Sequence, residues 1–517
     1  MYVSSVDLGV QDLHLNLHDH GISKAVYRLF FHPLAKYPGP RLAAITNWYG
    51  TIFAWRGDLH TQKYKWHAKY GDVVRTGPNT LCFATHTALK AIGALNANMQ
   101  KAEGYTSFSA SRRTPNTINA IDKQVHRFKR SIMSQVFSDQ GLKTIEERFL
   151  ANVRDFIKLL AVNDNIEPQD KDGWGSTKDM NAMCLHLAFD IISDLCYGND
   201  FDMLNSPDQR WFLAAMKVIS KRNSVCMTQP KIFNWKLDQM FLAPQYKTIL
   251  ASGTWVKKAT DARLQLGNDI KQKDAFYTMM NASDPETGMS FTPKDLWLES
   301  WLLLFAGSDT TSTTMSATFF YLAHHPDILA RVIKEVRSKF NSEEEICTGE
   351  TLSSCTFLIA CINEALRLAP SVPSMLPREI KEGGAMIDGN YIPQGFVVGV
   401  TCYSIHRSPK YFDAPTEFRP ARWIVDPANG VTEEKVKLAK QAFVPFGIGP
   451  RSCVGFKLAW AELLVTLART LWKYDMRLAP EASCCHGQRH DCDYEIIGWM
   501  TAIAEGPFLQ FRPAQRV

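Results

Sequence analysis

The chain lacks the features that mark several broad classes of protein. Its first 36 residues contain no run of about 20 apolar side chains, the length that a helix needs to span a bilayer. No secretory signal opens the chain, so we expect the twelve cysteines to be reduced thiols rather than a disulfide scaffold. No block of Lys and Arg indicates nucleic-acid binding, no internal repeat is present, and the net charge of +6 is modest for 517 residues.

The N-terminal stretch AVYRLFFHPL, residues 25–34, is short, apolar, aromatic and basic. This composition is typical of a segment that lies on a membrane surface. Residues 37–40, Tyr-Pro-Gly-Pro, then break the chain, as a hinge between a leader and a body does. We therefore expect a leader over residues 1–40 without a transmembrane helix, contact with a membrane surface, and a single domain over residues 41–517.

Helical periodicity dominates the body, and strand-like segments are short. The expected helices are 61–70, 83–96, 121–137, 141–163, 181–196, 208–221, 246–282, 292–323, 325–340, 355–368 and 455–473. The expected strands lie at 72–77, 81–85, 385–393 and 397–403, with a hairpin near 493–513. The fold class is therefore mainly α with minor β. Residues 370–378 and 407–450 look irregular and rich in proline, and so long a loop inside a compact fold usually carries function.

The longest expected helix has an unusual centre. Thr292, Pro293 and Asp295 form an N-terminal capping pattern, and residues 296–307 are apolar on nearly every side, so this helix should be central. Seven polar residues then follow Gly307, and a buried carboxyl such as Asp309 is costly in a core helix. A local rule broken inside a consistent helix indicates a functional or strained site.

The stretch FGIGPRSCVG, residues 446–455, sets one thiol, Cys453, on a flexible loop before a helix. The helix dipole and its free N–H groups are expected to lower the pKa of Cys453. A dinucleotide fingerprint is disfavoured because Ser452 stands where the third glycine belongs, and the Gly-x-Ser-x-Gly frame of a nucleophile elbow is absent. No second Cys or His lies at zinc or iron–sulfur spacing, so the thiol suits a single axial ligand to porphyrin iron.

The wider stretch FVPFGIGPRSCVG resembles the haem-binding signature F-x-x-G-x-R-x-C-x-G of the cytochrome P-450 monooxygenases. Every fixed position matches: Phe446, Gly449, Arg451, Cys453 and Gly455. The resemblance runs from about residue 37 to the C-terminus. It implies the cytochrome P-450 fold, with a long central helix over a haem b, small β-sheets, and Cys453 as the axial ligand of the haem iron.

Further motifs of that family follow in the expected order. NEALRL supplies Glu364 and Arg367, and PTEFRPARW supplies Arg422, with Ala421 where the family usually has a glutamate. The resemblance implies a buried charged network of Glu364, Arg367 and Arg422 that holds the haem loop and is structural in role.

The resemblance also implies contacts to the haem. Arg451, Arg378 and Arg130 are expected to bind the propionates, and His126 stands where the family usually has a tryptophan. The remaining expected haem contacts are Phe446, Gly447, Gly455, Ala306 and Gly307.

The polar break, AGSDTT at 306–311, resembles the family's oxygen-activation motif, in which Asp309 and Thr310 deliver protons to bound oxygen. Segments that read substrate in the family fall at 100–120, 205–230, 301–306, 371–376 and 498–502. The substrate contacts that we single out are Leu302, Phe305, Val372, Met375 and Met500.

The function implied is oxidation, by hydroxylation or a related step, of a small lipophilic metabolite by O2. Electrons are expected from NADPH–cytochrome P-450 reductase, with cytochrome b5 as a second candidate donor, and a basic face that includes Lys457 is a candidate docking site. The leader resembles those of filamentous-fungal members, which favours secondary-metabolite biosynthesis at the cytoplasmic face of the endoplasmic reticulum; the cytosol is the alternative location.

Other functions remain open. A haem-thiolate isomerase or dehydratase and a non-catalytic haem sensor are both disfavoured by the intact Asp309–Thr310 pair. NADPH consumption with substrates tests the sensor, and turnover without reductase tests a peroxygenase. The stretch SCCHGQRHDCD, 483–493, holds metal-capable side chains, but its spacing fits no regular zinc knuckle and a solvated loop is favoured. These side chains are Cys484, Cys485, His486, His490 and Cys492.

Overall fold

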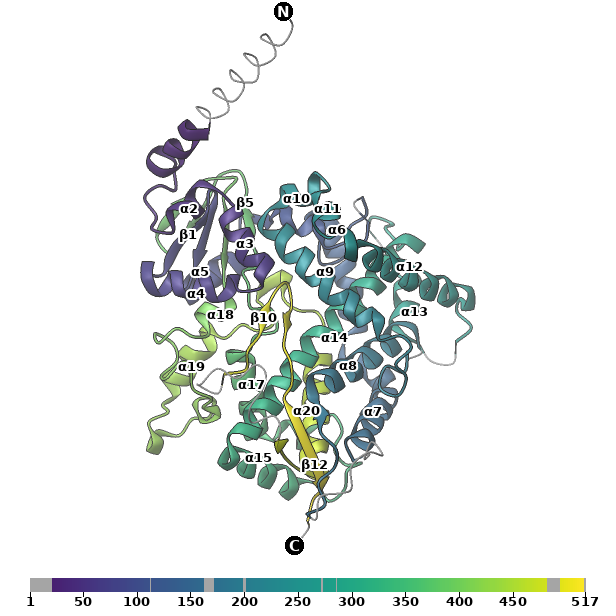
Figure 1. Ribbon diagram of the computed structural model, residues 1–517. Helices are drawn as coiled ribbons and strands as arrows, with labels where there is room; N and C mark the ends of the chain where they lie inside the picture. Colours follow the sequence, from purple (N-terminus) through teal and green to yellow (C-terminus); the bar gives the residue numbers. More distant parts are fainter. Residues whose placement is uncertain are drawn as a thin grey trace, which may run out of the picture.

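The computed structural model describes residues 21–111, 113–161, 172–198, 201–270, 273–284, 286–480 and 493–515. Helices make up most of the molecule, and the strands are short, which confirms the mainly α class with minor β (Figure 1). The helices, in chain order, are η1 (Tyr27–Phe31), α2 (Arg41–Ile45), α3 (Trp48–Arg56), α4 (Leu59–Tyr70), α5 (His86–Gly93), η2 (Glu103–Ser107), α6 (Lys123–Val136), α7 (Asp139–Ala161), α8 (Met180–Tyr197), α9 (Trp211–Thr228), α10 (Pro230–Asn234), α11 (Leu237–Phe241), α12 (Ala243–Leu266), α13 (Ala275–Met280), α14 (Pro293–His324), α15 (Pro326–Lys339), α16 (Glu350–Ser353), α17 (Thr356–Leu368), α18 (Cys402–Ile405), η3 (Pro420–Trp423), η4 (Pro427–Asn429), α19 (Glu433–Ala442), η5 (Gly449–Arg451) and α20 (Phe456–Lys473).

The strands form four small sheets rather than one large one. In the largest sheet the order is β1-β2-β8-β5-β3, with β2 parallel to β8 and the other neighbours antiparallel. The strands are β1 (Val73–Gly77), β2 (Thr80–Phe83), β3 (Met99–Lys101), β4 (Lys178–Asp179), β5 (Arg378–Ile380), β6 (Ala385–Ile387), β7 (Asn390–Ile392), β8 (Val397–Val400), β9 (Tyr474–Leu478), β10 (Ile497–Gly498), β11 (Ala502–Ile503) and β12 (Phe508–Pro513).

Helix α14 is the central element, because its apolar side chains point in every direction and must be covered on every side. The capping box is present: the Asp295 N–H donates to Thr292 Oγ1 at 3.2 Å, and the Thr292 N–H donates to Asp295 Oδ2 at 3.1 Å. Helices α8, α12, α17 and α20 pack around α14 (Figure 1). Their apolar faces and that of α7 form the main hydrophobic core.

Helix α14 approaches α8 closely at Gly307. A Cβ at Gly307 would lie 2.6 Å from Cγ1 of Ile192 on α8, nearer than two carbon atoms can pack. Glycine at this position therefore lets the two helices meet.

Three sequence-based boundaries are wrong. The expected helix 208–221 runs on as α9 to Thr228. The expected helix 246–282 is two helices, α12 and α13. Helix α12 ends at Leu266 because the next residue, Gly267, has a φ of +54°, which interrupts helical geometry. The expected loop 407–450 contains α19, a ten-residue helix that begins at the N-cap Thr432, whose hydroxyl accepts the Lys435 N–H at 3.4 Å. The sequence EEKVKLAKQA has an amphipathic helical pattern that the surrounding prolines obscured.

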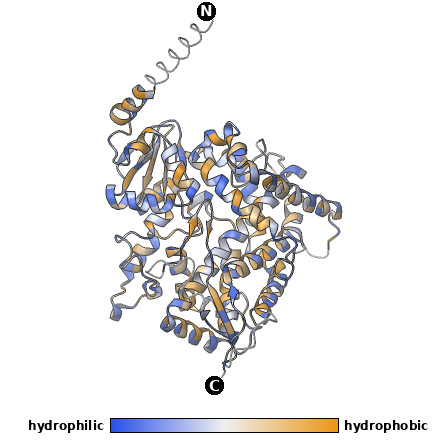
Figure 2. Ribbon diagram, in the orientation of Figure 1, coloured by the Kyte–Doolittle hydropathy of each residue, from blue (hydrophilic) through white to orange (hydrophobic). Residues whose placement is uncertain are grey.

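Figure 2 shows that many outer helices expose hydrophilic residues, as expected for elements that cover a core. The segment that includes η1 is an exception, since it carries hydrophobic residues beyond the packed body (Figure 2). Within the described ranges, no helix combines the length and the apolar character needed to cross a membrane.

Candidate functional site

The loop before α20 holds Cys453 close to the start of that helix. Gly455 caps α20, and the Cys453 N–H donates to the Phe446 carbonyl at 2.8 Å, which closes the loop. Gly449 has a φ of +70°, and a Cβ there would lie 1.9 Å from the carbonyl oxygen of Gly93 at the end of α5. Only glycine fits where the loop meets α5.

Cys453 is the one exposed thiol among the nine cysteines of the described chain. Burial by the surrounding protein nevertheless raises the pKa of Cys453, against the opposing effects of the Gly455 amide and the Arg130 guanidinium. The expectation of a lowered pKa is therefore wrong for the polypeptide alone, because lost hydration outweighs the helix terminus. Metal coordination deprotonates a thiol outright, so the raised pKa does not prevent this sulfur from binding a metal.

Four cations from separate elements surround this loop, and we call them the cation cluster: Lys101 on β3, Arg130 on α6, Arg378 on β5 and Arg451 in the loop itself. Arg451 Nη1 donates to the Ala120 carbonyl at 2.8 Å, and Arg130 donates to the Ser452 carbonyl. Arg378 Nη1 donates to the Tyr105 hydroxyl at 2.8 Å. Burial, reinforced by Arg378 and Arg130, lowers the pKa of Arg451 to about 10.

Sequence reasoning missed Lys101. Its side chain is 5% exposed and donates to the carbonyls of Thr117 and Ile118. It pairs with Arg378 across β3 and β5, and burial together with the nearby arginines holds its pKa well below the usual range. The three-residue strand that carries Lys101 has too little pattern to be recognised, so nothing in the sequence indicated that Lys101 meets Arg378.

The cation cluster fits the propionates of a haem. In the part of the chain that the structure describes, none of its four members forms an ion pair with a carboxylate. Like charges gathered in a partly buried site repel one another, and arginine forks suit carboxylates in geometry and charge. Two propionates would offset two of the four formal positive charges of the cluster, while the sulfur of Cys453 would bind the iron.

His126 is buried on α6 beside the cation cluster. Burial, with Arg451 as the next contribution, lowers its pKa to about 3. The imidazole is therefore neutral at physiological pH and has one N–H to donate. A neutral histidine in this place adds a hydrogen-bond donor without adding to the positive charge.

The polar break of α14 presents two different faces. Ala306, Gly307 and Thr310 are only partly buried, whereas Asp309 is buried. The Thr310 hydroxyl donates to the Ala306 carbonyl at 2.8 Å. Asp309 instead accepts a hydrogen bond from Thr501 Oγ1 at 3.0 Å, and burial raises the pKa of Asp309 to about 7.

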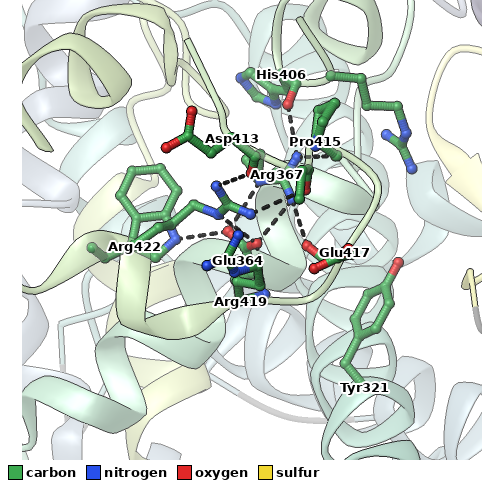
Figure 3. Close-up of polar contacts among 12 residues, drawn as sticks. Tyr321, Glu364, Arg367, His406, Asp413, Pro415, Glu417, Arg419 and Arg422 are labelled. Carbon is green, nitrogen blue, oxygen red and sulfur yellow. Dashed lines mark hydrogen bonds and ion pairs between the residues drawn. The ribbon is translucent and has the colours of Figure 1, made fainter. Parts of the chain in front are cut away.

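The structure brings Glu364, Arg367 and Arg422 together in one buried network (Figure 3). Arg367 donates to both carboxylate oxygens of Glu364, at 3.0 and 2.8 Å, and Arg422 Nε donates to Glu364 Oε1 at 2.9 Å. Trp423 Nε1 and the Arg419 N–H add further donors to Glu364, each at 2.9 Å. Burial opposes ionisation of Glu364, but the surrounding donors prevail and its pKa is lowered.

The same network fixes the chain before the cysteine loop. Arg367 donates to the carbonyls of His406, Pro415 and Glu417 at 2.9, 2.6 and 3.0 Å, and Arg422 donates to that of Asp413 at 2.6 Å (Figure 3). Residues 406–417 are therefore tied to α17 through charge-assisted hydrogen bonds. Sequence reasoning did not identify the carbonyl acceptors, since any residue type can supply one.

The expected substrate contacts separate into two groups. Met375 and Met500 line a cavity of about 640 Å³ between α3, the largest sheet and α9–α10. Val372 packs with Met500 in a small apolar cluster that also contains Tyr105. The other two, Leu302 and Phe305, are buried on α14 and are not among the residues that line this cavity.

Two expected haem contacts belong to the same loop. Phe446 packs edge to face on Phe456, with ring centroids 4.9 Å apart, and Gly447 has a φ of +67°. The metal-capable residues of 484–492 lie outside the described residues. Among the described residues, no group of three or more His, Cys, Asp or Glu side chains could hold a metal ion.

Comparisons with known proteins agree with this geometry. The family model for cytochrome P450 matches residues 38–489. The cytochrome P450 monooxygenase AKT7 of Alternaria alternata is 35% identical over 497 residues, covering 94% of each chain. The monooxygenase atnE of Emericella nidulans is 36% identical over 493 residues, which cover 94% of this chain and 93% of the relative.

The family model spans most of the chain, and several relatives exceed 30% identity over nearly their whole length. The signature cysteine is accessible, and the cation cluster lies beside it. The chain therefore belongs to the cytochrome P450 family, haem-thiolate oxidoreductases that incorporate oxygen from O2.

Proposed function

We propose that this monooxygenase hydroxylates or otherwise oxidises a small lipophilic metabolite in fungal secondary metabolism, with electrons from NADPH–cytochrome P450 reductase. The observation that carries the proposal is the exposed Cys453 beside the cation cluster. The polar break of α14 supports the proposal as well. Relatives of this chain bear the name of cytochrome P450 monooxygenase and come from filamentous fungi.

The roles of the site residues follow from their chemistry. Cys453 would bind the haem iron, and Arg130, Arg378 and Arg451 would bind the propionates, with Lys101 as a further cation. When bound, the haem supplies the activation of O2. Thr310 can hold a hydrogen bond on the partly open face of α14, and Asp309 can hold and release a proton because its pKa lies near physiological pH.

The cavity has room for a small molecule. Its volume of about 640 Å³ falls in the range of small-molecule sites. Its lining is mixed: Met375 and Met500 supply an adaptable apolar part of the wall, and Arg28, Lys63 and Glu379 supply charge. An apolar portion of the metabolite would pack on the two methionines.

Contact with a membrane surface has structural support. On η1, Phe30 and Phe31 are 70% and 73% exposed, and Arg28 lies between Tyr27 and these rings. The cavity of about 640 Å³ is lined both by Lys24, in the N-terminal segment, and by Trp235, which directly follows α10. These two segments therefore lie at the same end of the molecule. Aromatic and basic side chains of this kind favour a lipid interface. We place the enzyme peripherally at the cytoplasmic face of the endoplasmic reticulum.

Electron transfer from a flavoprotein favours a basic docking face around the cysteine loop. Lys457, the lysine that we singled out there, pairs with Asp139 at 2.7 Å on the surface. The charge of Lys457 is therefore partly balanced, and a docking face needs other cations. Cytochrome b5 is an alternative electron donor for the same surface.

The test has two parts. In Cys453→Ser, the ferrous carbon monoxide complex should lose its red-shifted absorption, because an alcohol cannot supply a soft anionic ligand, while the half-buried Cys347→Ser should keep it. Candidate metabolites that shift the Soret band of the wild type are then incubated with NADPH and reductase. Product that forms with hydrogen peroxide alone, and not with reductase, would identify a peroxygenase instead.

A further inference from the structure

The turn between β10 and β11 separates the cavity from α14. Met500 lines the cavity and packs against Tyr105 and Phe108. The next residue, Thr501, faces the opposite way and donates from Oγ1 to Asp309 Oδ2 at 3.0 Å. Helix α14 contacts β11 directly, and the hairpin lies beside α14 in Figure 1. One short turn therefore touches both the cavity and the carboxyl group of Asp309.

Thr501 is itself held by a residue of α9. Ser220 Oγ lies 2.9 Å from Thr501 Oγ1, and the Thr501 N–H donates to Ser220 Oγ at 3.1 Å. Because Thr501 donates its hydroxyl hydrogen to Asp309, Ser220 donates to Thr501, and the three side chains form a directed chain of hydrogen bonds. Ser220, Thr501 and Asp309 are all buried, so water does not readily replace a missing member.

The position of the Asp309 carboxyl group depends on this chain of bonds. The Thr501 hydroxyl donates a hydrogen bond to the Asp309 carboxyl group. Burial raises the pKa of Asp309, and Lys217, which is exposed one turn before Ser220 on α9, opposes that rise through its positive charge. Without the Thr501 hydroxyl, a buried carboxyl group would lack a partner and would turn toward another.

We propose that Ser220 and Thr501 are positioning residues for Asp309, and that Met500 couples this arrangement to the shape of the cavity. An occupant that moves Met500 moves Thr501, because the two are adjacent in a tight turn, and so changes the hydrogen bond to Asp309. Proton delivery then depends on whether the cavity is filled. This inference rests on the proposed role of Asp309 in moving protons.

The first experiment removes hydroxyl groups one at a time in the haem-loaded enzyme. Purified reductase supplies electrons from NADPH without added substrate, and hydrogen peroxide released per NADPH is measured in H2O and D2O. Thr501→Val and Ser220→Ala should change the peroxide yield at least twofold and alter the solvent isotope effect. Thr501→Ser, which keeps the hydroxyl, should restore both values.

A matched control removes a different buried hydroxyl from α14, the helix that carries Asp309. Within the described ranges, the hydroxyl group of Thr318 on α14 donates only to the Thr314 carbonyl, at 2.8 Å, so Thr318→Val should leave the peroxide yield unchanged. If Thr501→Val also leaves the peroxide yield unchanged while Asp309→Asn alters that yield, the positioning role of Thr501 is wrong and the proposed function stands. If neither variant alters it, the role of Asp309 itself fails.

The second experiment measures structure instead of turnover. Amide hydrogen exchange of residues 498–503 in the haem-loaded protein should accelerate at Thr501 in Ser220→Ala, because the Thr501 N–H loses its acceptor. Met500→Ala should accelerate the same amide and alter the peroxide yield. In the Thr501→Val background, Met500→Ala should add no further change in yield; full additivity of the two substitutions would refute the coupling through Thr501.

Discussion

At the scale of single residues, we expect Thr310 and Asp309 to make separable contributions. Thr310→Ala should fold, bind haem and consume NADPH, but should release more hydrogen peroxide and yield less product per NADPH, because the variant lacks the hydroxyl group that we propose as a hydrogen-bonding group on the partly open face of α14. Asp309→Asn should slow turnover instead, since an amide cannot relay a proton. Product, peroxide and NADPH are measured together, and wild-type coupling in Thr310→Ala would contradict the assigned role.

The raised pKa of Asp309 also predicts a dependence of stability on pH. The folded protein keeps this proton up to about pH 7, whereas the unfolded chain releases it near the ordinary value of 3.8. The contribution of Asp309 to stability is therefore lost as the pH rises from about 4 to 7 and stays constant above. The melting temperature of the wild type should fall relative to that of Asp309→Asn across this window; a constant difference would show that Asp309 has an ordinary pKa.

Many site residues could be named from the sequence, for a physical reason. Cys453, Glu364 and Arg367 lie in short local motifs in which the chemistry fixes the spacing. Lys101 and Thr501 could not be named, because each acts through a partner far away in sequence, Arg378 and Asp309. Periodicity and local spacing carry no information about such pairs.

At the scale of elements, the Glu364 network should be essential to the loop that it holds. Glu364→Gln leaves Arg367 and Arg422 as buried cations without a counter-charge, which costs about 3–5 kcal/mol in comparable sites. We expect low haem content and a much lower melting temperature. An exposed pair provides the control: Lys257→Gln breaks the bond to Asp261 on α12 and should change the melting temperature little. A small effect of Glu364→Gln would show that the loop is held by other contacts.

The helices that were predicted well are those with long amphipathic or fully apolar patterns, such as α7, α14 and α20. Errors arose where a break or a cap decided the outcome. Gly267 divides the expected helix 246–282, and Thr432 begins α19 inside a stretch that its prolines made look irregular. A single glycine with a positive φ can end a helix, and a single hydroxyl group at an N-cap can begin one, even where the hydrophobic pattern of the neighbouring residues predicts otherwise.

At the scale of the whole molecule, the exposed rings of η1 predict reversible membrane attachment. High salt with mild detergent should release the enzyme from microsomal membranes, because about two rings and a few cations bind weakly. Phe30→Ser with Phe31→Ser should shift the protein to the supernatant at lower salt without altering the carbon monoxide spectrum. Recovery of the enzyme only after the bilayer is dissolved would contradict peripheral attachment.

The close meeting of α14 and α8 has a consequence for how this enzyme can change. With no side chain at Gly307, Ile192 acts as the spacer between the two helices, and its bulk fixes how far α14 stands from α8 beside the polar break. A smaller residue at 192 would let α14 settle toward α8, and an alanine at 307 would push it away. The room on the open face of α14 can thus be tuned from a position on α8 that no substrate need touch, and selection for new substrates can act there without disturbing a catalytic group.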